Sequence, residues 1–398
     1  KNKVDGFRAG TEQYDVSTQE VNTSMPRGSK ENPYVIASVG DWEKFAKMMG
    51  PTTSTRGLNE YFVLAADLDF SGVTFRPIPR FAGYFHGLGH TLSNISCSSW
   101  VYWNGSSWVA FGATTSAGFG LFGRTDSATI TDLVVQDFYY TGMPNTSSLD
   151  WGNYHGGLVG VLCGNDRILN CHVQGILDRG TTTYAQHSWY GGIAGYTNNS
   201  VSTSVDTNIV IYRCTANTRF IGSAGEKENV HNGGILGDSA VKVNIFIYDC
   251  TSYLVNKRNS SHIMGNVGTI IGFVRQANRI VMENVVGTVY STEYNFETIG
   301  TSVGALLVGD PKQGNLKSVK NAFCHAAVGE ENGTGTTKSC RVVPDSYTNV
   351  HLGPSVTLSP LTAPNATKHS SVVDLYEAAK NSVGTGADNL PEQIWDKE

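Results

Sequence analysis

Two short signatures recur along this chain from about residue 81, and internal repeats constrain a fold more than any other sequence feature. The first is an apolar pair between glycines, as in Gly120-Leu121-Phe122-Gly123, and the second runs apolar, spacer, polar, small apolar, as in Ile168-Leu169-Asn170-Cys171. Copies of the first begin at residues 120, 157, 192 and 234, with looser ones at 270–272 and 307–309. Copies of the second end at residues 95, 133, 171, 214, 250, 285 and 322. The sequence therefore contains about seven imperfect repeats of roughly 37 residues.

The segments between these signatures are short, apolar and separated by Gly and Asn, without a helical period. The chain has 45 glycines in 398 residues, and charged residues make up only 16%. This composition is typical of strands and turns. We therefore predict an all-β protein, a right-handed parallel β-helix (solenoid) of about seven rungs with small α/β caps at both ends. Each rung buries its apolar residues only by stacking on its neighbours.

The second signature predicts two columns that run along the solenoid. One column faces the core, and the other lies at a turn where Asn and Asp accept unusual backbone angles. The predicted core column is Ile95, Leu133, Cys171, Cys214, Cys250, Val285 and Ala322, and the predicted turn column is Asn94, Asp132, Asn170, Arg213, Asp249, Asn284 and Asn321. Three of the seven cysteines thus serve packing, and Arg213 is placed to pair with Asp249. Cys324 and Cys340 are the remaining candidates for a disulfide.

The ends of the sequence depart from the repeat. Residues 1–31 are polar and predict an extended arm, either disordered or added as a strand to a neighbouring subunit. Residues 32–80 predict a strand-helix-strand cap, whose helix is capped by Asp41 and buries Trp42, Phe45, Ala46 and Met49. We expect the solenoid over 81–327. Residues 328–398 predict a polar loop and a C-terminal helical cap in which Ser371 begins a helix.

An aromatic segment interrupts the repeat between residues 99 and 111. Its Asn104-Gly105 pair predicts a hairpin with aromatic residues on both arms. Such rings stack on sugars, bury at protein interfaces, or cover the side of the solenoid. Candidate contacts with a glycan or a partner are Trp100, Tyr102, Trp103 and Trp108.

Charge and hydropathy limit the partners. The 29 Lys and Arg are scattered and the net charge is -5, so nucleic acid is not expected. No run of 18 apolar residues predicts a transmembrane segment, and the first ten residues lack a signal core, which predicts a mature or trimmed start.

Asn-x-Ser/Thr sequons would be glycosylated in a secreted eukaryotic protein. They occur at Asn22, Asn94, Asn104, Asn145, Asn198, Asn259, Asn332 and Asn365.

The segment Phe81-x-Gly83-x-Phe85-x-Gly87-x-Gly89, followed by His90-Thr-Leu92-Ser-Asn94-Ile95 and the later repeats, resembles the GLUG-repeat proteins. The similarity spans residues 32 to about 327, although His86 stands where the family usually has Asp. The resemblance implies a secreted or surface-attached protein whose repeats are noncatalytic and serve adhesion or scaffolding.

Catalytic patterns are weak. Paired carboxylates could serve glycoside hydrolysis, and the candidates are Asp67, Asp69, Asp132 and Asp249, which are better explained as turn residues. His86 and His90 have the spacing of a metal pair on a helix, but the glycines around them disfavour a helix. The sequence therefore predicts no catalytic, cofactor or metal site. The leading hypothesis is an extracellular structural or adhesive module that self-associates or binds a surface glycan or protein. A carbohydrate-active enzyme resembling tailspike depolymerases and a glycan-binding module are the alternatives.

Overall fold

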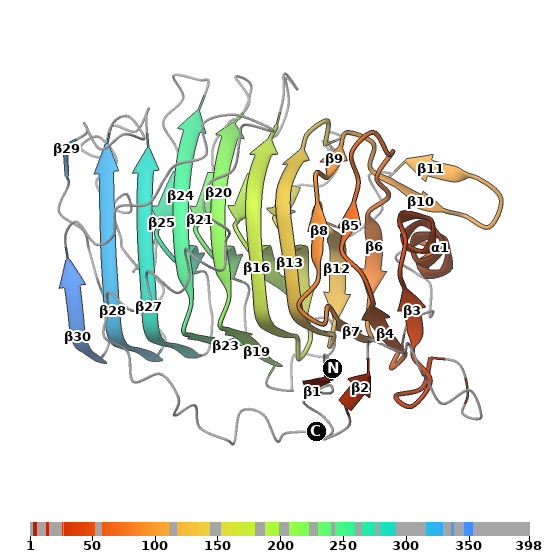
Figure 1. Ribbon diagram of the computed structural model, residues 1–398. Coiled ribbons are helices and arrows are strands. Elements are labelled where there is room, and N and C mark those ends of the chain that lie inside the picture. The colour runs from red at the N-terminus through yellow and green to blue at the C-terminus, as the bar shows by residue number, and fades with distance from the viewer. Residues whose placement is uncertain are drawn as a thin grey trace.

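The computed structural model describes residues 3–5, 13–15, 26, 28–51, 58–110, 118–143, 153–179, 188–198, 207–222, 230–239, 243–258, 265–274, 279–291, 316–328, 336–337 and 346–352. Over these residues the chain is almost entirely β-strand, and the strands coil into an elongated solenoid with one helix at its N-terminal end (Figure 1). The predicted parallel β-solenoid is confirmed.

Three parallel sheets form the sides of the coil. The six-stranded sheet contains β6 (Ile78–Phe81), β12 (Phe122–Asp126), β15 (Val159–Cys163), β18 (Ala194–Asn198), β22 (Leu236–Ser239) and β26 (Ile271–Val274). The four-stranded sheet contains β14 (Asn153–Gly156), β17 (Ser188–Gly191), β21 (Val230–Gly233) and β25 (Gly265–Gly268). The copies of the glycine signature that begin at residues 157, 192, 234 and 270 therefore connect a strand of the four-stranded sheet to one of the six-stranded sheet.

The third and longest sheet carries the second signature. Its repeat strands are β7 (Tyr84–His86), β8 (Thr91–Ser93), β9 (Ser96–Cys97), β13 (Thr129–Tyr140), β16 (Arg167–Asp178), β19 (Thr207–Tyr212), β20 (Thr215–Gly222), β23 (Val243–Tyr248), β24 (Thr251–Arg258), β27 (Arg279–Ser291) and β28 (Leu316–Val328). Further strands join this sheet, namely β3 (Tyr34–Ile36), β4 (Tyr61–Leu64), β5 (Leu68–Asp69), β30 (Ser346–Leu352) and the antiparallel β29 (Thr336–Thr337). The sheet thus continues across the expected boundaries at residues 80 and 327.

The predicted turn column lies in the left-handed backbone region. All six of its members from Asn94 to Asn284 have φ between 51° and 55°. Asn and Asp tolerate this conformation because their short polar side chains bond locally. Asn170 Nδ2 donates to Asp132 Oδ1 at 2.6 Å, and Asn284 Nδ2 donates to Asp249 Oδ1 at 3.0 Å. Arg213 Nε lies 3.8 Å from Asp249 Oδ2, so the pairing expected from the sequence is present.

Replacing Asn170 with alanine is expected to destabilise the solenoid by about 1–2 kcal/mol, because alanine pays the full cost of positive φ. The exchange also removes the amide bond to Asp132. Asn170→Gly loses the same bond but keeps the backbone freedom, and should be less destabilising. Thermal unfolding followed by circular dichroism compares the two variants. If alanine were no worse than glycine, backbone conformation would not be the reason for asparagine at this corner.

The predicted core column is buried over its described members. Ile95, Leu133, Cys171, Cys214, Cys250 and Val285 are each at most 1% exposed. The three stacked cysteines are free thiols, and each thiol contacts a backbone carbonyl oxygen of the preceding rung at 3.4–3.5 Å. Burial raises the pKa of Cys171 and Cys250 well above the usual thiol value. These cysteines therefore serve packing, as predicted.

The glycine signature makes a turn too tight for a side chain. A Cβ atom on Gly156, Gly191, Gly233 or Gly268 would lie 1.7–1.9 Å from the carbonyl oxygen of the residue three positions later. These four glycines precede the apolar pair by two positions and end the strands of the four-stranded sheet. Since this constraint recurs in four successive rungs, it is a property of the coil rather than of one loop.

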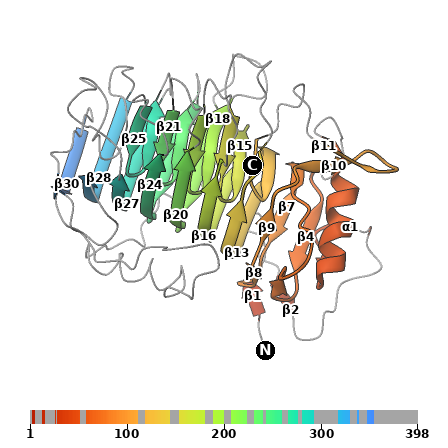
Figure 2. The same ribbon diagram turned by 90° about the horizontal axis from the view of Figure 1, so that it is seen from above.

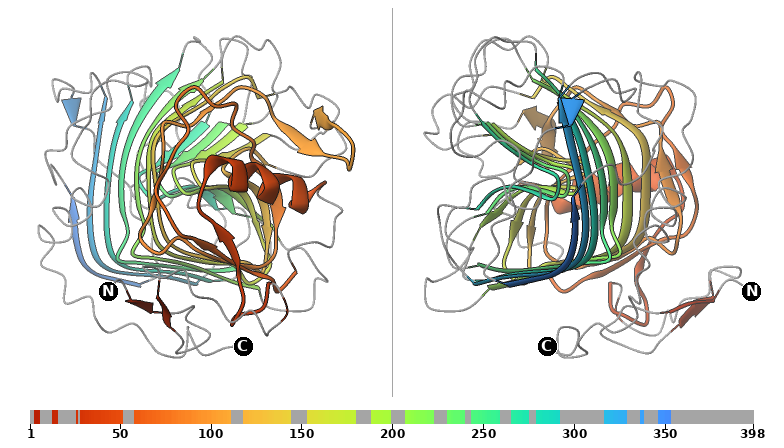
Figure 3. Two further views of the ribbon diagram at one scale, coloured as in Figure 1. Left: turned by 45° about the vertical axis from the view of Figure 1, so that its right-hand side comes forward. Right: turned by 90° about the vertical axis from the view of Figure 1, so that its left-hand side faces the viewer.

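The N-terminal cap contains the helix α1 (Val39–Met49), which lies across the end of the coil (Figure 3). Its buried residues Trp42, Phe45, Ala46 and Met49 are those predicted. The predicted cap residue is wrong, because Ser38 is the N-cap and its Oγ accepts from Asp41 N at 3.1 Å. Asp41 Oδ2 in turn accepts from Ala37 N at 3.1 Å, one residue before the N-cap, and ties the helix start to the preceding chain. This bond is the main reason that the pKa of Asp41 is lowered.

Two expected end segments fall largely outside the described residues. The helix expected after Ser371 lies there entirely. In the arm of residues 1–31, β1 (Lys3–Asp5) pairs antiparallel with β2 (Gln13–Asp15). Whether the arm adds to a neighbouring subunit stays a prediction.

Candidate functional site

The aromatic hairpin predicted from the sequence is present beside α1 (Figures 1 and 2). Its arms are β10 (Val101–Trp103) and β11 (Trp108–Ala110), which pair antiparallel with Trp103 opposite Trp108. Residues 104–107 form the connection, where Asn104 Oδ1 accepts from Ser106 N and Ser107 N, each at 2.9 Å. Four residues therefore connect the arms, and the Asn104 side chain organises the turn.

Trp100 is not available for an external contact. It is 3% exposed, its Nε1 donates to Thr141 O at 2.8 Å, and its ring lies edge-on against Phe119 and Tyr140. The expectation that Trp100 contacts a glycan or partner is therefore corrected to a core role. Trp100 directly precedes β10, and its ring lies on the side of this segment that faces the solenoid.

Trp103 and Trp108 remain half-buried, as does Tyr102. The two indoles are 5.4 Å apart at an interplanar angle of 66°. Lys47 Nζ lies 4.8 Å from the Trp103 ring centroid, and the Arg76 guanidinium lies 4.5 Å from the Trp108 centroid. A cation over an indole at this distance contributes about 0.5–1 kcal/mol at an exposed site. The paired indoles are thus held against the cap by two cations.

A surface pocket of about 550 Å³ lies between residues 70–75 and residues 94–99, which precede the hairpin in the sequence. Hydroxyl and amide side chains and two phenylalanines form its wall. Its lining residues are Phe70, Ser71, Gly72, Val73, Thr74, Phe75, Asn94, Ser96, Ser98 and Ser99. The two wall segments continue directly into Arg76 and into the hairpin. We call these lining residues together with Trp103 and Trp108 the cap site.

Asp69 fixes the wall of this pocket. Its Oδ1 accepts from Ser71 N at 2.9 Å, from Ser71 Oγ at 2.6 Å and from Asn94 Nδ2 at 2.9 Å. Asp67 Oδ1 similarly accepts from Thr91 N at 2.8 Å and lies 3.0 Å from His90 Nδ1. Both carboxylates, considered as catalytic candidates from the sequence, therefore hold turns of the cap.

His86, the other histidine of this region, is fully buried. Its Nδ1 accepts from Leu88 N at 3.0 Å, and its Nε2 lies 3.4 Å from Asp132 Oδ2. The third carboxylate candidate, Asp132, is thus bound at a corner, and Asp249 is bound in the same way by Asn284. Within the described ranges, no cluster of three His, Cys, Asp or Glu side chains could hold a metal ion.

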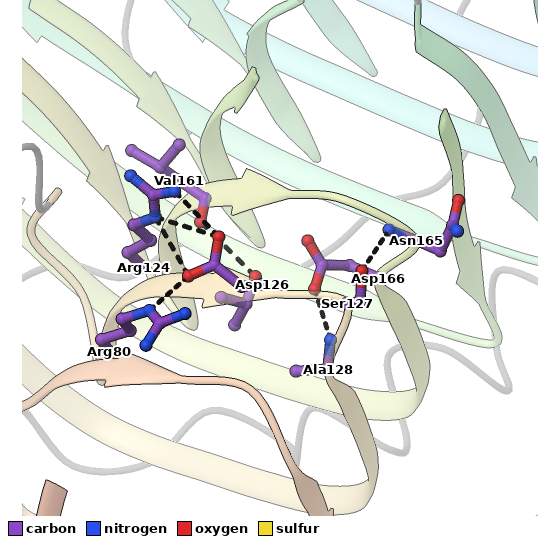
Figure 4. Close-up of polar contacts among 9 residues, drawn as sticks. Arg80, Arg124, Asp126, Ser127, Ala128, Val161, Asn165 and Asp166 are labelled. Atoms are coloured by element: carbon purple, nitrogen blue, oxygen red, sulfur yellow. Dashed lines mark hydrogen bonds and ion pairs between the residues drawn. The ribbon is translucent and has the colours of Figure 1, made fainter. Parts of the chain in front are cut away.

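A second polar cluster lies at the end of the six-stranded sheet (Figure 4). Asp126 pairs with both Arg80 and Arg124. Asp166 is fully buried, its Oδ1 accepts from Ala128 N at 2.8 Å, and burial raises the pKa of its carboxyl well above the usual value. Because Asp166 has no solvent access, this carboxyl serves structure rather than chemistry on a substrate.

The raised pKa of Asp166 makes its contribution to stability depend on pH. The group keeps its proton to a higher pH in the folded state than in the unfolded state, where it ionises above about pH 3.9, so stability is lost as pH rises from there through the folded pKa. Asp166→Asn cannot ionise and keeps an oxygen acceptor for Ala128 N. We expect its melting temperature to exceed that of the parent by roughly 2 °C or more at pH 8, with the difference shrinking towards pH 4. A pH-independent difference in thermal melts would contradict the assignment.

The remaining predicted sites fall mostly outside the described residues. Asn104 and Asn198 are exposed, whereas Asn94 is half-buried in its corner. Five sequons lie outside, namely Asn22, Asn145, Asn259, Asn332 and Asn365. Cys340 also lies outside and the side chain of Cys324 is not described, so their disulfide stays a prediction.

In the part of the chain that the structure covers, no helix has the length and apolar character needed to span a bilayer.

Comparisons with known proteins bear on the fold alone. No protein family model matches the chain, so the resemblance to GLUG-repeat proteins rests on its own residues. Halomucin of Haloquadratum walsbyi is 28% identical over 200 residues, which is 42% of this chain and only 2% of halomucin. A crystal structure of a putative immunoglobulin A1 protease from Bacteroides ovatus matches with a TM-score of 0.52 and 20% identity, over 82% of this chain and 86% of that one. This chain thus shares its fold with a solved bacterial structure.

Proposed function

We propose that the chain is a noncatalytic adhesive module that acts outside the cell or on its surface, and that it contacts glycans through the cap site. The observation that carries this proposal is the pair of half-buried indoles on a hairpin that follows a hydroxyl-lined pocket wall in the sequence. Sugar rings stack on aromatic faces, and their hydroxyl groups exchange hydrogen bonds with Ser, Thr and Asn side chains.

The solenoid supports this role by rigidity. The pocket wall belongs to turns that Asp69 ties together, and the hairpin packs on a helix whose buried face closes the core. Binding to a rigid site loses little conformational entropy, which favours affinity for small polar ligands. A repetitive, rod-shaped scaffold with one such site at its end suits an adhesin.

The sequons and one local sequence similarity support an extracellular place. The sequons would be glycosylated only in a secreted protein of a eukaryote, and the local similarity is to a protein named as a mucin. Assembly into a filament is a finer form of the same proposal. Electron microscopy of the purified chain tests it, because a filament subunit polymerises and an isolated adhesin does not.

Glycan-array binding followed by isothermal titration calorimetry tests the cap site. Trp103→Ala and Trp108→Ala are each expected to weaken glycan binding about tenfold or more, since stacking on one aromatic ring contributes on the order of 1 kcal/mol beyond its buried area. Tyr84→Ala is the matched control, because Tyr84 is also a half-buried ring, stacked on Tyr61 at 4.2 Å within the same cap. Equal affinities for the parent and both Trp variants, or no binding to any glycan, would contradict the proposal.

A further inference from the structure

The cap site carries a cation without a carboxylate partner. Arg76 is half-buried and its guanidinium stacks on Trp108, yet no ion pair joins it to an acidic side chain among the described residues. Arg80 and Arg124, which lie on the neighbouring sheet, both pair with Asp126. Lys47 also faces the indoles, at 4.8 Å from Trp103 and 5.9 Å from Trp108, although Glu43 pairs with it at 3.0 Å. Arg76 therefore adds a positive charge beside the indoles that no described carboxylate neutralises through an ion pair.

Arg76 follows the pocket lining in the sequence and stacks on the hairpin. It directly follows Phe75, which lines the pocket, and its carbonyl oxygen is fixed by Trp42 Nε1 at 2.9 Å. Its charge also acts on the Cys97 thiol, which lies between the lining residues Ser96 and Ser98. Burial raises the pKa of Cys97 to about 12, and the positive charge of Arg76 opposes that rise.

The pocket lining itself contains hydroxyl, amide, apolar and glycine residues and no charged side chain. Asp69, which adjoins the lining, is committed to Ser71 and Asn94. A ligand in the pocket would therefore meet neutral hydrogen-bonding groups on the walls and cations at the hairpin edge. Guanidinium groups match carboxylates in shape and charge, and charge-assisted bonds are about twice as strong as neutral ones.

We propose that the cap site selects glycans that carry a carboxylate sugar, a uronate or a sialate, with the sugar ring on the indoles and its carboxylate at Arg76. This inference rests on the proposed glycan-binding function and adds its ligand class. Lys47 supplies a second, weaker attraction, since Glu43 shares its charge.

Paired probes separate the charge from the sugar. 3′-Sialyllactose is compared with lactose, and tetragalacturonate with its methyl ester, by isothermal titration calorimetry at low salt. We expect each acidic probe to bind about tenfold tighter than its neutral counterpart, and Arg76→Gln to bring the ratio of acidic to neutral affinity close to one. A preference confined to one acidic pair identifies the sugar as sialate or uronate. Lys44→Gln is the control. Lys44 is an exposed cation on α1, the helix that also carries Lys47; its side chain is 81% accessible and does not face the indoles.

The outcomes distinguish the two proposals. If acidic and neutral probes bind equally and Trp103→Ala weakens both, the charge inference is overturned and the glycan site stands. If Arg76→Gln keeps the preference, the inference is likewise overturned. If none of the probes nor any array glycan binds, both proposals fall. If circular dichroism shows that Arg76→Gln does not fold, the inference is tested on the parent protein by varying the salt concentration. Its preference for acidic probes must then decline between about 0.05 and about 0.5 M salt, because exposed charge pairs are screened.

Discussion

Gly191→Ala is expected to destabilise the solenoid by about 3 kcal/mol or more, and to lower the yield of folded protein. The added Cβ would lie 1.7 Å from Ala194 O and 2.9 Å from Gly237 N, both of them backbone atoms. Neither can move away without shifting the strands β18 and β22, which are hydrogen-bonded to each other and to the rungs on either side. Since rungs stack only on their neighbours, a shift in one rung also disturbs the rungs on either side.

Two other glycines separate lack of space from backbone conformation. Gly89→Ala has no atom within 4 Å of the added Cβ but has φ of +77°, so it should lose about 1–2 kcal/mol from backbone strain alone. Gly40→Ala, in the first turn of α1, meets only Ser38 Oγ at 3.6 Å and should be neutral or slightly stabilising. Melting temperatures should therefore fall in the order Gly40→Ala, Gly89→Ala, Gly191→Ala. A Gly191 variant as stable as the Gly40 variant would show that the turn has room that the backbone geometry does not indicate.

Trp42→Ala is expected to cost about 3–5 kcal/mol, because it removes the largest side chain at the end of the core. Trp42 is 1% exposed and stacks on Phe75 with the ring centroids 5.8 Å apart, while Phe85 and Phe122 meet its edges. It also fixes the carbonyl oxygen of Arg76. A cavity here opens the N-terminal end of the solenoid, where the terminal rung has no further rung to cover it.

Trp42→Phe and Trp108→Ala are the matched comparisons. Phenylalanine keeps a ring in the core but loses the hydrogen bond to Arg76 O, so an intermediate loss is expected. Trp108→Ala removes an indole of the same size from the surface of the same cap, and should cost less than about 1 kcal/mol. Thermal melts and limited proteolysis of the N-terminal region measure these differences. Equal losses for Trp42→Ala and Trp108→Ala would contradict the role given to Trp42 in closing the core.

The repeat could be predicted from the sequence because every rung has the same backbone corner and the same core-facing position. A corner in the left-handed region favours Asn or Asp, and a strand facing a dry core favours Ile, Val, Leu or Cys, so the same residue types return with each turn of the coil. The described parts of the columns through Asn170 and Cys171 confirm both inferences. Arg213, which fits the corner less well, shows that the environment tolerates exceptions.

Predictions from the local sequence were wrong where two nearby residues could each occupy the same structural position. Ser38 and Asp41 are both good N-caps, and the sequence alone favoured Asp41, which instead bonds back to Ala37. Trp100 and Trp103 lie in one aromatic segment, and only the direction of the hairpin decides which ring is buried. The glycines at positions 156, 191, 233 and 268 were overlooked because the recurring apolar pair after them is more conspicuous. Their doubling with a following glycine in three rungs was the available signal.

The sequence by itself determined the solenoid, its core and its corners. These features depend on the pattern within one repeat and on the stacking of equivalent residues in successive rungs. Only the tertiary structure decided where a ligand could bind. The cap site joins residues 70–76 to residues 94–108 and to Lys47 of α1, segments that approach one another because the helix closes the first rung. No repeat pattern predicts this arrangement, because among the described residues it is found at the N-terminal end of the coil beside α1 and not in the successive rungs.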